Sequence, residues 1–334
     1  MSMKIFVVGD YYSGTGPANV TKEYIRTLPK GTLFLKSKNK LLRLIELYTT
    51  IPKCDVVFLS GHSKQNLHAI RIAKKQNVKV AFLMHGSVDY ENRINGVSDE
   101  SMTEVEKKTM EGCDLILAVS NQFEHWLKKQ YPQYADKISH VTNGVDYKII
   151  NEQPVMTKRD NNKIISIGGG MPRKRIVIIC RAIELLRNKG MEISLTVAGD
   201  IGLDSDKINK YSFVNNIGLV DHKRVIEELQ SAKLFVQNSC FETFGLAPVE
   251  AIMCGCDILL SKECGALSLF KTGVYDDDII MDTENVEEIA AKIEKLLKDE
   301  NHNRLIVELD KEHTSWEYRS EQLQNILKNL IEKE

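Results

Sequence analysis

Short runs of apolar residues alternate with stretches of helical periodicity along most of the 334-residue chain. In the first half the apolar runs are "KIFVVG", "TLFLKS", "DVVFLS", "VKVAFLMH", "LILAVS" and "ISHVTNG", with helix-like segments such as "QNLHAIRIAKK" between them. The second half repeats this pattern with "KIISIGGG", "EISLTVAGD", "FVNNIGLV", "LFVQNS" and "DILLSK". Strands that alternate with helices form parallel sheets covered by helices on both faces. The sequence therefore predicts an α/β fold with two doubly wound, Rossmann-like domains.

The length of the chain and one polar segment indicate where these domains end. A chain of 334 residues exceeds what one hydrophobic core usually serves. Residues 146–163 are polar, contain Pro154 and have little periodicity, which is typical of a linker. We predict an N-terminal domain over residues 1–150 and a C-terminal domain over residues 151–315, both Rossmann-like. A final amphipathic helix over residues 316–334 is expected to pack back on the first domain.

Composition argues against several classes of protein. No run approaches eighteen consecutive apolar residues, so no transmembrane helix is expected, and the first residues lack the layout of a signal peptide. The seven cysteines lie mostly in apolar runs, which is typical of reduced thiols in a cytoplasmic protein. Cys254, Cys256 and Cys264 match no common zinc spacing. We therefore expect a cytoplasmic protein without a metal site.

The net charge of −1 conceals a basic segment, because residues 20–80 alone carry +10. Within it, "TLFLKSKNKLLRLIELYTT" combines lysines with a leucine-rich helical stripe. Such a stretch suits contact with an anionic membrane surface, which would be the inner face of the membrane. It also suits a core helix with an ordinary solvated face. No nucleic-acid-binding module has a signature in the chain, so we expect no nucleic acid partner.

Residues 241–251, "FETFGLAPVEA", place two glutamates close together. The preceding apolar run predicts a buried strand, Pro248 suits the first turn of a helix, and Gly255 suits its end. Glu242 is then expected in the loop that leaves the strand, and Glu250 in the first helical turn. Free N–H groups at such a turn suit a phosphate, and carboxylates accept hydrogen bonds from sugar hydroxyls. Solvation or the helix dipole also explains either glutamate alone.

The stretch "ETFGLAPVEAIMCG" resembles the E-x7-E motif of retaining family 4 glycosyltransferases, which have the GT-B fold of two Rossmann-like domains facing across a cleft. The segments "SIGGGMPRKRIVIICRAIELL", "VAGD", "NNIGLV", "VTNGVD" and "SWE" fall in that family's order, so the resemblance covers most of the chain. It implies transfer of a hexose or N-acetylhexosamine from a nucleotide diphosphate sugar, with UDP-sugar favoured. The implied acceptor is a hydroxyl of a glycan or lipid-linked glycan in bacterial surface polysaccharide assembly.

The resemblance implies that the domain over residues 1–150 is the acceptor-side domain and that the domain over residues 151–315 binds the nucleotide sugar. It also implies roles for residues of this second domain. Glu250 would hold the ribose hydroxyls, and Glu242 would contact the donor sugar. Lys174, helped by Arg173, would stabilise the leaving diphosphate. The backbone N–H groups that would approach the diphosphate or the sugar are those of Phe244, Gly245 and Leu246.

The segment "MPRKR" departs from the family pattern at two positions. An arginine often precedes the lysine near the end of the strand, where residues 168–170 are all glycine here, so Arg173 or Arg175 would replace it. The lysine is also commonly followed by glycine, where this chain has Arg175. Three cations at the start of a helix oppose its dipole, which indicates an anionic ligand at this point.

In the first domain the resemblance indicates three residues. Gly16, as first choice, and Gly14, as second, lie in the first strand-to-helix loop, which closes over the diphosphate in the family. The loop lacks a full G-x-G-x-x-G pattern, so a dinucleotide site is not indicated. His85 ends the fourth predicted strand, and its implied roles are a hydrogen bond to the sugar and charge stabilisation.

The resemblance implies a same-face, retaining mechanism without a metal or other cofactor, because neither glutamate has the position of a nucleophile in the family. Asp204 and Asp206 look like a D-x-D metal motif, but they also suit the start of a helix, and we interpret them so. Residues 275–280, "YDDDII", are predicted to form an exposed turn. Two other functions remain open, namely a non-catalytic GT-B chaperone or binding protein and a nucleotide-sugar epimerase.

Overall fold

The computed structural model describes residues 3–147 and 158–332, which form two compact units. The first unit comprises Met1–Asn92, Ser98–Gly144 and Glu312–Glu334, and the second comprises Arg93–Val97 and Val145–Lys311. The predicted linker over residues 146–163 and the predicted boundary at residue 150 lie largely outside the described residues. Each unit is therefore described by itself.

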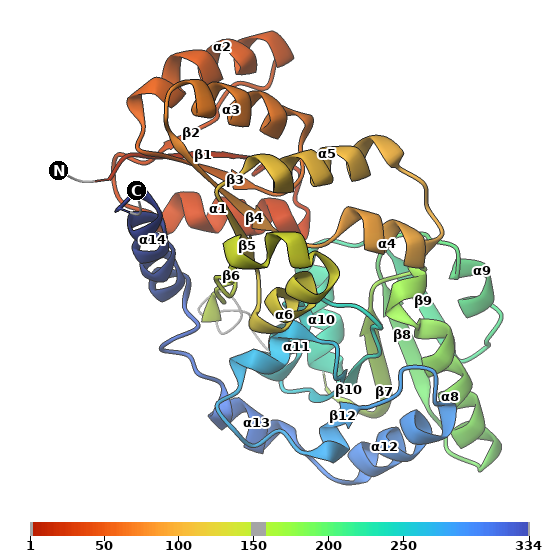
Figure 1. Ribbon diagram of the computed structural model, residues 1–334. Coiled ribbons are helices and arrows are strands. Elements are labelled where there is room, and N and C mark those ends of the chain that lie inside the picture. The colour runs from red at the N-terminus through yellow and green to blue at the C-terminus, as the bar shows by residue number, and fades with distance from the viewer. Residues whose placement is uncertain (1–2, 148–157, 333–334) are drawn as a thin grey trace. The chain divides into compact units, whose positions relative to one another are not determined.

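The first unit is built on a six-stranded sheet in the order β2-β1-β3-β4-β5-β6, in which every pairing is parallel. Two helical layers cover it, one containing α2, α3 and α5 and the other containing α1 and α14 (Figure 1). Residues of β1, β3 and β4 are almost all buried, because the strands lie between these layers. The elements are β1 (Ile5–Gly9), α1 (Gly16–Thr27), β2 (Leu33–Phe34), α2 (Lys40–Thr50), β3 (Val56–Ser60), α3 (Lys64–Lys75), β4 (Lys79–Met84), α4 (Val88–Asn95), α5 (Glu100–Gly112), β5 (Leu115–Ala118), α6 (Asn121–Gln130), β6 (Ile138–His140) and α14 (Trp316–Glu332).

The second unit contains another fully parallel six-stranded sheet, in the order β12-β11-β10-β7-β8-β9. Helices α8, α9 and α12 form one layer, and α10, α11 and α13 form the other. A cluster of isoleucines, leucines and valines from α8, α12 and the central strands makes its core. The elements are β7 (Asp160–Ile167), α8 (Ile176–Asn188), β8 (Ser194–Ala198), α9 (Ser205–Ile208), β9 (Val214–Gly218), α10 (His222–Ser231), β10 (Ala232–Gln237), α11 (Ala247–Met253), β11 (Asp257–Ser261), β12 (Ile279–Ile280), α12 (Val286–Lys298) and α13 (His302–Glu308).

The last helix of the chain, α14, packs on α1 of the first unit. The Trp316 ring meets the buried Tyr24 ring edge-on, with 5.3 Å between centroids. Glu317 lies 3.2 Å from the Arg26 guanidinium. A Cβ on Gly144 would come within 2.5 Å of the Trp316 ring, so a glycine at position 144 lets the chain pass close to this tryptophan.

The prediction of an exposed turn at residues 275–280 is right for residues 275–277, which are exposed at a short 3-10 turn, and wrong for the rest. The segment contains the edge strand β12, and Asp278 is only 2% exposed. Its carboxylate accepts hydrogen bonds at 2.9 and 3.0 Å from Arg304 and at 2.7 Å from Asn301. A buried carboxylate is tolerated because these donors, both near α13, pair with it.

Strand order defines one position in each sheet where ligands bind in doubly wound folds. In the first sheet, the direction in which successive strands are added reverses between β1 and β3. In the second sheet it reverses between β7 and β10. Loops at the carboxyl ends of the strands on either side of such a reversal diverge and leave a crevice. Functional side chains are therefore expected in the loops that follow these four strands.

Candidate functional site

In the second unit, the loops after β7 and β10 bring a buried charge cluster together. The carboxylate oxygen Oε2 of Glu242 contacts the Lys174 ammonium and lies 3.4 Å from Arg173 Nη1. Gln237 Nε2 donates to the same oxygen at 2.9 Å, and Ser239 Oγ at 3.4 Å. The side chains of Glu242, Lys174 and Arg173 are only 10%, 12% and 15% exposed. Three predicted site residues thus meet at the reversal point of the sheet.

Glu242 is ionised in this cluster. Burial pushes the pKa of its carboxyl up, but Lys174 and Arg173 outweigh burial and leave the pKa below its ordinary value. All four contacts are made to Oε2, and the part of the chain that the structure describes provides no hydrogen-bond partner for Oε1. An ionised carboxylate with one oxygen fixed and the other open is suited to accept a hydrogen bond from a sugar hydroxyl.

The glycines before Lys174 make room for its side chain. A Cβ on Gly168 would come within 2.5 Å of Lys174 Cγ, so any other residue there would displace the lysine. Gly169 has a positive φ of 56°, and a Cβ on it would meet the Asp200 carbonyl oxygen at 2.1 Å. Where the family often has an arginine, glycines let the Lys174 side chain and the loop after β8 lie close against the backbone of residues 168 and 169.

Of the three cations predicted at the start of a helix, Arg175 is the N-cap of α8, whereas Arg173 and Lys174 lie just before it. Residues Pro172–Lys174 form a short 3-10 turn, and α8 begins only at Ile176. Arg175, where the family commonly has glycine, adopts a left-handed backbone with φ of 53°, a conformation that glycine takes most readily. Its Nε lies 2.7 Å from Glu284. Carboxylates of the same unit thus partner all three cations.

The turn after Glu242 is built as the sequence suggested. Gly245 has a φ of 83°, and α11 begins at Ala247 with Pro248 in its first turn. Within the described residues, the backbone N–H groups of Phe244, Gly245 and Leu246 have no hydrogen-bond acceptor, although Phe244 itself is buried. These three donors remain for a ligand, as the prediction requires.

Glu250 lies in the first turn of α11 and meets a histidine that sequence reasoning missed. His222 Nε2, from the start of α10, lies 3.0 Å from Glu250 Oε1. The hydrogen bond to Glu250 raises the pKa of His222, and partial burial opposes that rise. Twenty-eight residues separate the two side chains in sequence, so only the packing of α10 on α11 brings them together.

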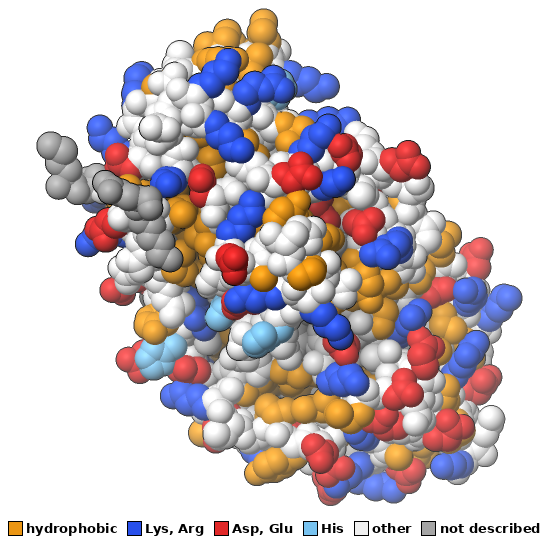
Figure 2. All heavy atoms as spheres, in the orientation of Figure 1, with side chains coloured by type: hydrophobic (Ala, Val, Ile, Leu, Met, Phe, Trp, Pro, Cys, Tyr) orange, Lys and Arg blue, Asp and Glu red, His pale blue; other side chains and the backbone are white. Residues whose placement is uncertain are grey.

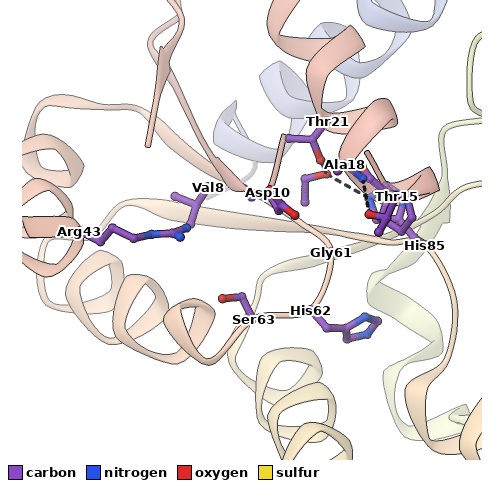
Figure 3. Close-up of a pocket in the computed structure, with 13 residues that line it drawn as sticks. Val8, Asp10, Thr15, Ala18, Thr21, Arg43, Gly61, His62, Ser63 and His85 are labelled. Carbon is purple, nitrogen blue, oxygen red and sulfur yellow. Dashed lines mark hydrogen bonds between the residues drawn. The ribbon is translucent and has the colours of Figure 1, made fainter. Parts of the chain in front are cut away.

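In the first unit, a pocket of about 570 Å³ opens at the carboxyl ends of β1, β3 and β4 (Figure 3). It coincides with the reversal point between β1 and β3. Its wall consists of Val8, Gly9, Asp10, Thr15, Pro17, Ala18, Thr21, Arg43, Ser60, Gly61, His62, Ser63 and His85. Of these, only His85 was predicted; polar residues such as Arg43 and Ser63 carry no motif that would have identified them.

His85 lies in this pocket as an uncharged imidazole. Its Nε2 is 3.1 Å from Ser60 Oγ. Burial, with a small contribution from His62, lowers the pKa of His85 to about 3, so the ring is neutral at pH 7. A neutral ring can donate a hydrogen bond to a hydroxyl, which suits the first role predicted for it. Both predicted roles, the sugar hydrogen bond and charge stabilisation, stay predictions.

The loop with Gly14 and Gly16 lies at the rim of the same pocket. Gly14 has a φ of 73°, and Gly16 is the first residue of α1. Thr15 and Pro17, rather than the two glycines, line the pocket. A Cβ on either glycine would meet nothing within 4 Å. The left-handed backbone therefore favours glycine at position 14, whereas no close contact in this unit demands it at position 16.

Three further features concern metal binding, the cysteines and membrane-spanning helices. Among the described residues, no three histidine, cysteine or acidic side chains are grouped so that they could hold a metal ion. The seven cysteines are free thiols. No helix in the described residues has the length and apolar character needed to cross a membrane.

Two family models together match residues 6–313. "Glycosyltransferase Family 4" matches residues 6–148, and "Glycosyl transferases group 1" matches residues 149–313. Among curated proteins, a poly(glycerol-phosphate) alpha-glucosyltransferase of Bacillus subtilis is 30% identical over 38% of this chain and 20% of its own length. An O-antigen chain mannosyltransferase B of Escherichia coli is 26% identical over 58% of this chain and 54% of its own length. The chain thus spans about half or less of these relatives.

Solved structures resemble the whole chain. A sucrose-phosphate synthase from Thermosynechococcus elongatus superimposes with a TM-score of 0.67, at 16% identity, over 98% of this chain and 99% of its own. The catalytic domain of starch synthase IV from Arabidopsis thaliana superimposes with a TM-score of 0.68, at 11% identity, over the full length of both. At these identities the likeness concerns the fold.

Proposed function

Because the chain belongs to glycosyltransferase family 4 and has the GT-B fold, we propose that it transfers a sugar, with retention, from a nucleotide diphosphate sugar to a hydroxyl group. The single observation that carries this proposal is the Glu242 carboxylate held by Lys174 and Arg173 at the reversal point of the second sheet. The favoured donor is a UDP-sugar. The proposed acceptor is a glycan or lipid-linked glycan.

Each residue of the charge cluster has a proposed step. Lys174 and Arg173 would receive the negative charge that develops on the departing diphosphate, and this stabilisation is strong in a site with little water. The open Oε1 of Glu242 would bind a hydroxyl of the sugar. Glu250 would bind the ribose hydroxyls, with His222 orienting its carboxylate. Phosphate oxygens of the donor would accept the proton of the attacking hydroxyl on the same face.

The proposed setting is bacterial surface polysaccharide assembly on the cytoplasmic side of the membrane. Two relatives support it by name: the poly(glycerol-phosphate) alpha-glucosyltransferase and the O-antigen chain mannosyltransferase. The proposed reaction needs no metal, because the two cations of the cluster balance the leaving charge.

The test is turnover of a panel of UDP-, GDP-, ADP- and dTDP-sugars, with and without an acceptor extract. We expect UDP release that depends on acceptor, a product whose anomeric proton shows the donor's configuration by NMR, and unchanged rates in EDTA. An inverted product would refute retention. Binding of a protein partner without any nucleotide binding would favour the chaperone alternative, and formation of an isomeric nucleotide sugar would favour the epimerase.

A lipid-linked acceptor is supported by the outer face of α2. Leu41, Leu42, Ile45 and Tyr48 are 67%, 54%, 51% and 56% exposed on this helix. Exposed Lys36 and Lys38 precede the helix, and exposed Lys40 is its first residue. Figure 2 shows hydrophobic and basic side chains side by side at the top of the view, over α2. Apolar residues flanked by lysines fit the surface of an anionic bilayer.

The double substitution Leu41→Ser and Ile45→Ser is therefore expected to reduce binding to vesicles that contain phosphatidylglycerol by about tenfold or more, because two apolar side chains lose their insertion energy. Cosedimentation with vesicles measures this, and added salt should weaken binding. Val307→Ser, at a residue of the second unit that is 77% exposed, is the matched control. Equal binding of all variants, or a change of oligomeric state instead, would contradict the prediction.

A further inference from the structure

We propose that the pocket of the first unit binds a phosphate group carried by the acceptor, and that Arg43 recognises it. The proposal rests on the proposed function, because it assigns the pocket to the acceptor of the same transfer. It adds a substrate class, a phosphate-bearing sugar, and a residue that no motif indicated.

Arg43 reaches into the pocket from α2. Figure 3 shows its side chain entering from one side, with Thr15 and His85 on the opposite side and Asp10 between. Its Nε is buried without a hydrogen-bond partner, and among the described residues no carboxylate pairs with its guanidinium. Leaving buried donors unpaired is costly. A guanidinium with its donors uncommitted is well suited to bind a phosphate through two parallel hydrogen bonds.

Arg43 is also the source of positive charge in this pocket. The His85 imidazole is neutral, because burial lowers its pKa to about 3. His62 Nε2 lies 3.0 Å from the buried Glu106 carboxylate, which offsets any charge on that ring. Ser63 caps α3, accepting the Gln65 N–H at 3.3 Å, so its hydroxyl proton can be donated at the positive end of a twelve-residue helix.

Asp10 restricts the ligand further. Hydrogen bonds from Ser13 and from the Tyr12 N–H lower the pKa of Asp10, so it is ionised and repels a polyanion. A carboxylate between Arg43 and His85 accepts hydrogen bonds from hydroxyls instead. The pocket therefore fits a sugar whose hydroxyls face Asp10 and whose phosphate reaches Arg43. Such a group occurs in a free sugar phosphate and in the head group of a lipid-linked sugar.

Binding without donor tests this proposal independently of turnover. Isothermal titration calorimetry at constant ionic strength would compare glucose, inorganic phosphate and glucose 6-phosphate. We expect phosphate and glucose 6-phosphate to bind the wild type, and Arg43→Met to weaken their binding about 10- to 100-fold, the effect of one lost charged hydrogen-bonding group. Arg43→Lys should restore part of the affinity. Arg71→Met, at an exposed arginine of α3, should bind as the wild type does.

Two binding results would overturn the proposal: glucose 6-phosphate binding no better than glucose, or equal affinity in the wild type and Arg43→Met. In the transfer assay, Arg43→Met should raise KM for the phosphate-bearing acceptor and leave KM for the donor unchanged; the reverse pattern would also overturn it. Comparing a soluble sugar phosphate with a polyprenyl-linked one in detergent identifies the source of the phosphate. Phosphate binding without any sugar transfer would refute the proposed function alone.

Discussion

Replacing Glu242 with glutamine is expected to lower kcat/KM for sugar transfer about 100- to 1,000-fold, the usual effect of removing one fixed partner of a developing charge. The amide keeps the shape of the side chain but loses the charge that positions Lys174 and Arg173. Two poorly exposed cations would then lack their counterion, so the free energy of unfolding should also fall, by about 1–3 kcal/mol. Initial rates and urea unfolding measure the two effects.

An exposed glutamate of the same unit, Glu263, offers a matched control. Glu263→Gln should transfer sugar at the wild-type rate and unfold at the wild-type urea concentration. If Glu242→Gln also kept wild-type kcat/KM, Glu242 would have no part in the donor site. A loss of activity larger than any loss of stability would place the effect in the site rather than in the fold.

Much of the fold could be predicted from periodicity. The apolar runs ending at Gly9, Ser60 and Gln237 are strands in the structure, because buried parallel strands lack polar alternation. The turn after Glu242 was also predictable, since Pro248 and Gly245 have narrow backbone preferences. These features depend on residues within one short segment, and the sequence shows such residues directly.

The arrangement of the site was not predictable from periodicity. Lys174 and Glu242 are separated by 68 residues and meet because β7 pairs directly with β10, an order that no local pattern encodes. The same holds for His222 beside Glu250. Arg43 lies in a stretch whose leucines and lysines drew attention to its outer face, and only the fold shows that its side chain lines a pocket.

The burial of Asp278, within residues 275–280, was also not predictable, because it depends on contacts with residues later in the chain. Three consecutive aspartates indicate an exposed loop by composition, but Arg304 and Asn301 approach from later in the chain and pair with Asp278. Residues far along the chain also form ion pairs with the cations at residues 173–175. Their charge indicated an anionic ligand, which stays a prediction, and in the structure Glu242 and Glu284 already pair with these cations.

Replacing Lys174 with methionine is expected to lower kcat about 100- to 1,000-fold, because the leaving diphosphate loses a fixed positive charge. KM for the donor should change much less, since Glu250 and the turn at Gly245 would still hold it. The acid limb of the pH–rate profile should also move to higher pH. Burial raises the pKa of Glu242, while Lys174 and Arg173 lower it, so removing the first cation lets the pKa rise, and the ionised form is lost earlier on acidification.

Lys210→Met, at an exposed lysine of the same unit, should alter neither kcat nor the acid limb. Lys174→Arg should keep the acid limb in place, because the charge beside Glu242 is retained. The double variant Glu242→Gln/Lys174→Met should lose little more activity than either single variant, since both disrupt one coupled pair. Additive losses would instead mean that the two side chains fill their proposed roles independently and that the contact between them has no part in catalysis.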